Sequence, residues 1–273
     1  MIKYMINNSI NKLAKNIRLD LLKMIFKSKS SHIGSSLSIV DLLAVLYGKK
    51  IIKFSANNPM SSNRDKFVLS KGHAAAALYS TLANIGYFSK SELFQYGLTG
   101  SNLLAHASHH VPGVEFSTGS LGHGLPIGCG LALAYKRKKL SNTVFIMNSD
   151  GEMSEGSNWE AILFAAHHKL DNLILIIDYN KLQSFGSIEK TLRLEPLKEK
   201  LKSFDWNVYE VDGHNYLALE RVLLKAKNFK GKPNCIIANT IKGKGISFME
   251  NKVVWHYKSP SVKEYEMAIR ELD

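Results

Sequence analysis

Two side chains with oxygen donors, one a carboxylate and one an amide, follow two neighbouring apolar runs near the middle of the chain. Asp150 comes shortly after the run 143–147, and Asn180 comes shortly after the run 173–177. A helical stretch over about 155–168 separates the runs, and this order predicts a crossover between two parallel strands. We therefore expect both side chains at the carboxyl ends of neighbouring strands, where open α/β sheets bind ligands. Such oxygen donors suit a hard cation such as Mg²⁺, which also takes phosphate oxygens.

Polar residues follow buried strands in many α/β proteins, so the two positions alone do not establish a metal site. The longer string is more specific: it reads Asp150-Gly151-Glu152, Glu155-Gly156, Trp159-Glu160-Ala161 and then 178–186, which begins Asp178-Tyr179-Asn180. It closely resembles the thiamine-diphosphate motif of the transketolase family, which ordinarily begins Gly-Asp-Gly and ends on an asparagine. Ser149 stands where the first glycine is usual. Since serine tolerates positive φ less well than glycine, this departure affects the expected backbone geometry of the loop rather than the motif itself.

A glycine-rich string before another predicted helix reads Gly119-Ser120-Leu121-Gly122-His123-Gly124. Its spacing is not the dinucleotide-binding fingerprint, and no convincing strand precedes it. The wider string 112–125 resembles the transketolase segment that passes beside the aminopyrimidine ring of the cofactor, with His123 where glutamine is more usual. The resemblance implies cofactor contacts from Gly119, Ser120 and Leu121.

Four more histidines, His32, His73, His106 and His256, lie in predicted loops that match transketolase positions in the family's order. A single loop histidine is more often a surface residue than a catalyst, but four in this order favour a site. Histidine titrates near neutral pH and therefore exchanges protons with hydroxyl groups readily. The resemblance implies that His32, His106 and His256 orient donor hydroxyls and move their protons, and that His73 and His256 flank the cofactor.

The resemblance implies thiamine diphosphate and Mg²⁺ as cofactors. Asp150, Asn180 and the backbone carbonyl of Leu182 would bind Mg²⁺, and Asn180 and Gly151 would also lie against the diphosphate, which Gly151 lets the backbone approach closely. The implied reaction transfers a two-carbon ketol unit from a ketose or ketose phosphate to an aldose acceptor.

The resemblance runs from about residue 10 to residue 260 and corresponds to the diphosphate-binding domain of a transketolase. In the family, a pyrimidine-binding domain supplies the glutamate that activates the cofactor. We therefore expect this chain to be the N-terminal subunit of a split transketolase, active only with a separate C-terminal, pyrimidine-domain subunit, in a heterotetramer.

The order of predicted elements indicates an α/β fold. Strands at 67–69, 143–147, 173–177, 207–211 and 235–240 alternate with helices, the first of them over 10–30 and followed by a Ser/Gly loop at 30–36. This pattern predicts a doubly wound, mainly parallel sheet with helices on both faces, a single thiamine-diphosphate-binding domain over 1–273.

Composition limits the partners and the cellular compartment that we expect for this protein. The net charge of +13 comes from 36 basic and 23 acidic residues, without the aromatic interleaving or motif spacing of nucleic-acid-binding proteins. Apolar runs are too short to cross a membrane, and residues 1–5 do not begin a signal peptide. The two cysteines, Cys129 and Cys235, are expected to be core residues. We expect a cytoplasmic protein that binds neither nucleic acid nor membranes.

Two other interpretations stay open at this stage. The first is a related thiamine-diphosphate enzyme, either a decarboxylase or a protein like deoxyxylulose-phosphate synthase; the strings 152–160 and 178–186 favour transketolase over both. The second is a binding or regulatory module that has lost catalysis, for which Ile33, Ala105 and Ser149 are the evidence because they depart from the family pattern.

Overall fold

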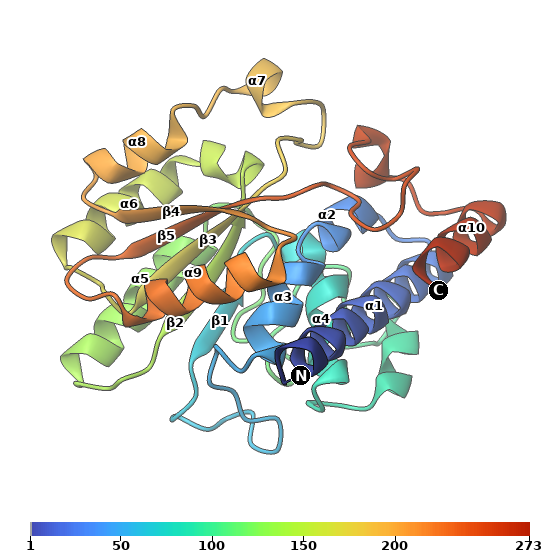
Figure 1. Cartoon of the computed structure of the whole chain (residues 1–273), viewed down its shortest axis with the longest axis horizontal. Coiled ribbons are helices and arrows are strands. Elements are labelled where there is room, and N and C mark those ends of the chain that lie inside the picture. The colour runs from blue at the N-terminus through green and yellow to red at the C-terminus, as the bar shows by residue number, and fades with distance from the viewer. Residues whose placement is uncertain (1) are drawn as a thin grey trace.

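The centre of the structure is a five-stranded sheet in which all neighbouring strands are parallel, in the order β1-β2-β3-β5-β4. The computed structural model describes residues 2–273, with side chains from residue 9 onwards; Met1 lies outside the described residues. The strands are β1 (Lys66–Leu69), β2 (Val144–Ser149), β3 (Leu173–Tyr179), β4 (Asn207–Asp212) and β5 (Asn234–Asn239) (Figure 1). The predicted parallel α/β sheet is confirmed.

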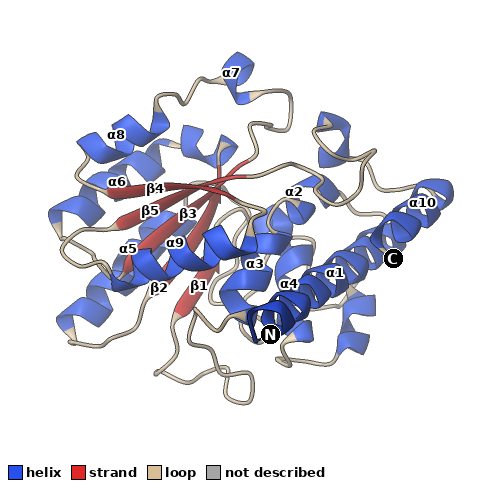
Figure 2. Cartoon of the chain, viewed as in Figure 1, coloured by secondary structure: helices blue, strands red, loops and turns tan. Residues whose placement is uncertain are grey.

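Helices cover both faces of this sheet (Figure 2). One face packs against α1 (Ile2–Ser28), α3 (Val40–Gly48), α4 (Ala75–Asn84) and α9 (Tyr216–Asn228), and the other against α5 (Gly124–Arg137), α6 (Gly156–His167) and α8 (Leu197–Ser203). Alternate residues of a strand enter different cores: Phe145 belongs to the first and Ile146 to the second. The strands read as continuous apolar runs because both of their faces are buried.

Several elements differ from the sequence-based expectations. The predicted Ser/Gly loop at 30–36 contains the short helix α2 (Ile33–Leu37), whose residues are all buried, so packing overrides their poor helix propensity. The helices α7 (Ile188–Thr191) and α10 (Val262–Leu272) were not predicted. Helix α10 lies along α1, where the rings of Tyr265 and Phe26 stack with centroids 4.2 Å apart.

Single turns of 3-10 helix carry several residues of the expected site. These turns are η1 (Gly72–Ala74), η3 (Gly151–Ser154) and η4 (Val253–His256); a longer 3-10 helix, η2 (Lys90–Gln95), follows α4 and carries none of these residues. Cys129 and Cys235 are free and buried, as expected of core residues. Across residues 2–273, none of the helices has the length and apolarity needed to span a membrane.

Two glycines of α5 provide a test of how closely this helix packs on the sheet. A Cβ at Gly128 would lie 2.3 Å from Cδ1 of Ile146, whereas a Cβ at Gly130 would meet nothing within 4 Å. We predict that Gly128→Ala lowers the free energy of unfolding by about 1–3 kcal/mol through overpacking. Gly130→Ala should raise it by roughly 0.5–1 kcal/mol because alanine favours the helix. Urea unfolding followed by circular dichroism measures both, and a stabilising Gly128→Ala would contradict the packing.

Candidate active site

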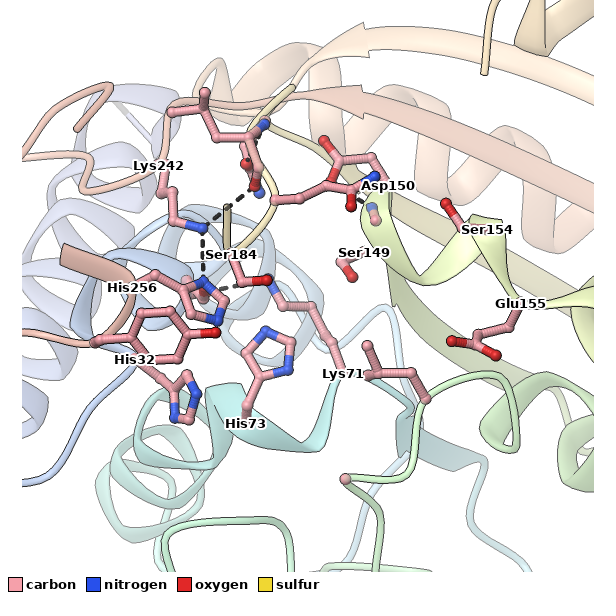
Figure 3. Close-up of a pocket in the computed structure, with 18 of the residues that line it drawn as sticks. His32, Lys71, His73, Ser149, Asp150, Ser154, Glu155, Ser184, Lys242 and His256 are labelled. Carbon is pink, nitrogen blue, oxygen red and sulfur yellow. Dashed lines mark hydrogen bonds between the residues drawn. The ribbon is translucent and has the colours of Figure 1, made fainter. Parts of the chain in front are cut away.

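A cavity of about 360 Å³ opens at the carboxyl ends of the strands. The loops after β1, β2, β3 and β5 all contribute to its lining, together with the segments around residues 32, 106, 119 and 256. Figure 3 shows His32, His73 and His256 gathered on one side of the cavity and Asp150 on the other. The cavity therefore lies where the sequence predicts a ligand site, at the strand ends of a parallel sheet.

The structure brings Asp150, Asn180 and Leu182 together in this lining. Asp150 is 1% exposed, and its two carboxylate oxygens accept the backbone N–H groups of Gly151, at 2.7 Å, and Lys181, at 2.5 Å. Asn180 accepts the Leu182 N–H at Oδ1, 3.1 Å away, and donates from Nδ2 to Asp178 at 3.1 Å. These bonds fix the directions of the carboxylate and the amide.

The donor set fits Mg²⁺ with a diphosphate. A carboxylate, an amide oxygen and a backbone carbonyl are ligands that Mg²⁺ prefers, and it completes its shell with phosphate oxygens and water. Burial, and then the nearby charge of Asp178, raise the pKa of Asp150 to about 7. A bound divalent cation would favour the ionised carboxylate instead. Two buried atoms among the lining residues, Ser154 Oγ and Gln183 Nε2, have no hydrogen-bond partner within the described chain, which is expected of groups that await a ligand.

Two buried lysines give the cavity positive charge. Lys71 is 0% exposed, forms an ion pair with Asp178 and donates to the Ser35 carbonyl at 3.1 Å. Lys242, 1% exposed, donates to the Leu182 carbonyl at 3.2 Å and contacts His256 Nδ1 at 3.0 Å. Burial and then the charge of Lys71 lower the pKa of Lys242 to about 8. Ammonium groups in this position complement an anionic ligand such as a diphosphate.

Sequence reasoning assigned no role to either lysine. Each stands directly before a glycine, in Lys71-Gly72 and Lys242-Gly243, at or just beyond the end of a strand. That position was the available signal. Their burial was not predictable, because lysine is almost never fully buried unless it is paired.

The four expected histidines meet in the same cavity although they come from four separate segments. The ring centroid of His32 lies 5.2 Å from that of His73, 5.6 Å from that of His106 and 5.0 Å from that of His256. The His32 N–H also donates to the His256 carbonyl at 2.8 Å, which joins the first and last of these segments.

The surroundings of these imidazoles favour the neutral form. Burial is the main cause: with neighbouring positive groups it lowers the pKa of His32 to about 4 and that of His256 to about 3. It also lowers the pKa of His106, and the pKa of His73 falls well below its ordinary value. A neutral imidazole has one donor and one acceptor nitrogen, so a ring whose acceptor nitrogen has no other partner is able to hold a hydroxyl and to take its proton.

The glycine-rich string contributes to the lining in part. Gly119 and Leu121 line the cavity, whereas Ser120 is exposed and lies outside the lining. Gly119 has a φ of 150°, and a Cβ there would lie 2.8 Å from Cδ2 of His106, so glycine allows the close approach of this histidine. The cofactor contacts of Gly119, Ser120 and Leu121 stay predictions.

The departure at Ser149 is accommodated without strain. Ser149 is not among the residues with positive φ, and its N–H donates to Glu152 Oε2 at 3.2 Å. Gly151 follows Asp150 in the lining, and a Cβ there would lie 3.0 Å from Cγ of Gln183. Glycine at position 151 thus keeps the loop clear of the neighbouring segment.

Comparisons with known proteins agree with this geometry. Residues 9–268 match the family described as transketolase, thiamine diphosphate binding domain. An apulose-4-phosphate transketolase subunit of Phocaeicola vulgatus is 39% identical over 252 residues, which cover 92% of this chain and 89% of that protein. A 6-deoxy-6-sulfo-D-fructose transketolase subunit of Clostridium sp. is 41% identical over 95% of this chain and 94% of that protein.

The chain also matches solved structures of transketolases, but it covers a smaller share of their length. The transketolase of Campylobacter jejuni matches with a TM-score of 0.91 and 30% identity, covering 97% of this chain and 43% of that chain. The transketolase of Leishmania mexicana matches with a TM-score of 0.91 and 29% identity, over 97% and 41%. This chain thus spans nearly the full length of the subunit relatives and less than half of these transketolases.

Proposed function

This chain belongs to the transketolase family, and we propose that it is the N-terminal, thiamine-diphosphate-binding subunit of a split transketolase. One observation carries the proposal: the oxygen donors of Asp150, Asn180 and Leu182 share a cavity with four histidines and two buried lysines. This cavity offers a place for a metal-bound diphosphate and, beside it, groups that handle hydroxyl protons. The reaction would move a two-carbon ketol unit from a ketose or ketose phosphate to an aldose acceptor.

Each group of residues has a separate task in this proposal. Asp150, Asn180 and the Leu182 carbonyl would hold Mg²⁺ against the diphosphate, with Gly151 and His73 beside it. Thiamine diphosphate, when bound, supplies the carbon nucleophile and the electron sink that ketol transfer needs. His32, His106 and His256 would bind the donor hydroxyls, and His32 or His106 would accept a proton when the donor is cleaved and return it to the acceptor.

The Lys242 contact determines which nitrogen of His256 carries the proton. An ammonium group only donates hydrogen bonds, so His256 Nδ1, 3.0 Å from Lys242 Nζ, is the acceptor. The proton of the neutral ring is therefore on Nε2. His256 would thus begin the reaction as a hydrogen-bond donor through Nε2, whereas His32 and His106 are free to begin as acceptors.

A second subunit is part of the proposal. Its support is the word subunit in the names of relatives whose length this chain nearly covers. Exposed side chains at the cavity fit such a partner: Tyr257, which lines the cavity, is 55% exposed, and Phe185 and Val254, each within two residues of a lining residue, are 85% and 57% exposed. We propose a pyrimidine-domain subunit that completes the cofactor site, in a heterotetramer. The single domain over 1–273, the cytoplasmic location and the absence of nucleic-acid and membrane binding stay predictions.

The metal assignment predicts a specific loss of cofactor binding. Asp150→Ala removes the only charged oxygen donor assigned to the metal, so it should abolish Mg²⁺-dependent binding of thiamine diphosphate to the assembled enzyme. Asn180→Ala should weaken binding by at least about tenfold. Isothermal titration calorimetry measures both, with Glu266→Ala, on the exposed face of α10, as the control for loss of a carboxylate. Unchanged affinity in Asp150→Ala would refute the metal site.

The histidine assignment predicts a loss of turnover rather than of binding. His32→Ala and His256→Ala should each lower kcat by about 10²–10⁴-fold, as expected for a general acid–base group. Cofactor affinity should change far less. His110→Ala, at an exposed position outside the cavity lining, is the matched control and should keep its kcat. A loss below about fivefold at either position, in correctly assembled enzyme, would reduce that histidine to a structural role.

The proposed function itself is tested by a ketol-transfer assay on the purified chain, with and without a pyrimidine-domain subunit. The chain alone should show no turnover, because the glutamate that activates the cofactor would come from the partner, and activity should appear on mixing. Robust turnover by the chain alone would refute the split enzyme. Decarboxylation of 2-oxo acids by the mixture, without ketol transfer, would favour the related-enzyme alternative.

A further inference from the structure

A partly buried polar network lies next to the cavity without lining it. Its centre is Asp41, which is 3% exposed and accepts three hydrogen bonds. Arg18 Nη2 and His214 Nδ1 approach Asp41 Oδ2 at 2.7 Å and 2.8 Å, and the Tyr216 hydroxyl donates to Oδ1 at 3.0 Å. None of these four residues belongs to the cavity lining.

His214 is held in one tautomer by its two partners. Its Nε2 lies 2.9 Å from the backbone nitrogen of Ile241, and a backbone N–H only donates, so Nε2 must be the acceptor. The ring proton is therefore on Nδ1 and is donated to the carboxylate of Asp41. A histidine that is oriented by a carboxylate on one side and holds a third group on the other acts as a positioning residue.

The group that His214 holds is the first amide of the segment 241–245. Arg18 Nε holds the same segment further along, donating to the Lys244 carbonyl at 3.2 Å. Between these two points the Gly243 N–H donates to the Gly34 carbonyl at 2.9 Å. The Asp41 network and α2 thus fix this segment at three successive places.

Lys242 is the residue that these contacts enclose. Its ammonium group reaches the Leu182 carbonyl and His256 Nδ1, both in the cavity lining. Its own carbonyl accepts the Asn251 N–H at 2.9 Å. Ile241 directly precedes Lys242, so a shift of the Ile241 amide would also move the backbone from which this ammonium group extends.

The loop that carries His214 is itself tightly placed. The Gly213 N–H donates to the Asn239 carbonyl at 2.8 Å, and a Cβ at Gly213 would lie 2.4 Å from Cγ2 of Thr240. The His214 N–H donates to Asp212 Oδ1 at 2.9 Å. The end of β4 and the end of β5 therefore approach closely enough for the imidazole to reach the Ile241 amide.

We propose that His214, held by Asp41 as the Nδ1-protonated tautomer, is a positioning residue that fixes the Ile241 amide and, through it, Lys242 and His256 in the active site. Only the kinetic part of this inference rests on the proposed function. The positional part is a statement about the chain itself and has its own measurement.

Three substitutions separate the two hydrogen bonds of the imidazole. His214→Asn keeps a donor near the Nδ1 position for Asp41 and loses the acceptor for Ile241. His214→Gln places an acceptor near the Nε2 position and keeps the Ile241 bond. His214→Phe keeps the ring and loses both bonds. His167→Asn, an exposed histidine at the end of α6, is the matched control.

Hydrogen–deuterium exchange of the full chain, alone and with its partner subunit, reads the position of the segment directly. We expect peptides covering 241–245 and 253–257 to exchange about tenfold faster in His214→Asn and His214→Phe, since the partly buried Ile241 amide has lost its hydrogen-bond partner. His214→Gln and His167→Asn should match the wild type. Unchanged exchange in His214→Asn, or faster exchange spread over the whole sheet, would overturn the inference.

Kinetics of the assembled enzyme give the second measurement. His214→Asn should lower kcat by about tenfold and raise the thiamine diphosphate concentration for half-saturation, and His214→Gln should restore both to within about twofold. A loss in His214→Gln equal to that in His214→Asn would overturn the role of the Ile241 bond. A wild-type assembly without ketol transfer would refute the proposed function and leave the exchange result standing.

Discussion

The candidate active site depends on one buried carboxylate, Asp178. It is fully buried and is surrounded by donors: the ammonium of Lys71, the hydroxyls of Ser38 and Thr240, and the amide of Asn180. Burial would raise the pKa of Asp178, but the Lys71 charge and these hydrogen bonds lower it, so the carboxylate is ionised. Its partners stand at the carboxyl ends of β1, β3 and β5 and before α3. A single charge therefore holds together the loops that form the cavity, and removing it would leave the Lys71 ammonium buried without a counter-charge.

Glu152 has the corresponding task on the other side of the cavity. It is 0% exposed and accepts the Ser70 hydroxyl, the Gly122 N–H at 2.9 Å and the Ser149 N–H at 3.2 Å. Burial raises its pKa, and these hydrogen bonds oppose the increase. The glycine-rich string and the loop that carries Asp150 are separate motifs in the sequence, yet this carboxylate fixes both of them to the end of β1. The loops of the cavity are thus anchored on two buried carboxylates, Asp178 and Glu152, and the ligand-facing groups are arranged around them.

The sequence predicted the parts of this arrangement that are local. Apolar runs ending in polar residues placed Asp150 and Asn180 at strand ends, and the family's motif order brought the four histidines into one group of candidates before any geometry was known. The sequence did not predict the burial of Lys71, because the ion pair with Asp178 joins residues that are 107 positions apart. Asp178 itself was expected beyond the strand, whereas it lies within β3. Helix α2 was expected as a loop because the packing that buries its serines is also non-local.

The departures from the family pattern bear on whether catalysis has been lost. Ser149 avoids positive φ and binds Glu152, so it takes part in the anchoring that the loop needs. Ile33 is 0% exposed inside α2 and adds to the core. Ala105 also packs against that core, and it leaves the neighbouring His106 in the cavity lining. Each of these three departures therefore falls on packing or backbone shape, while every oxygen and nitrogen donor assigned to the metal or to proton transfer is present. A module released from catalysis would have no reason to keep two buried lysines beside four histidines around one cavity, since burying ammonium groups is costly. This cost favours an active enzyme over a binding module.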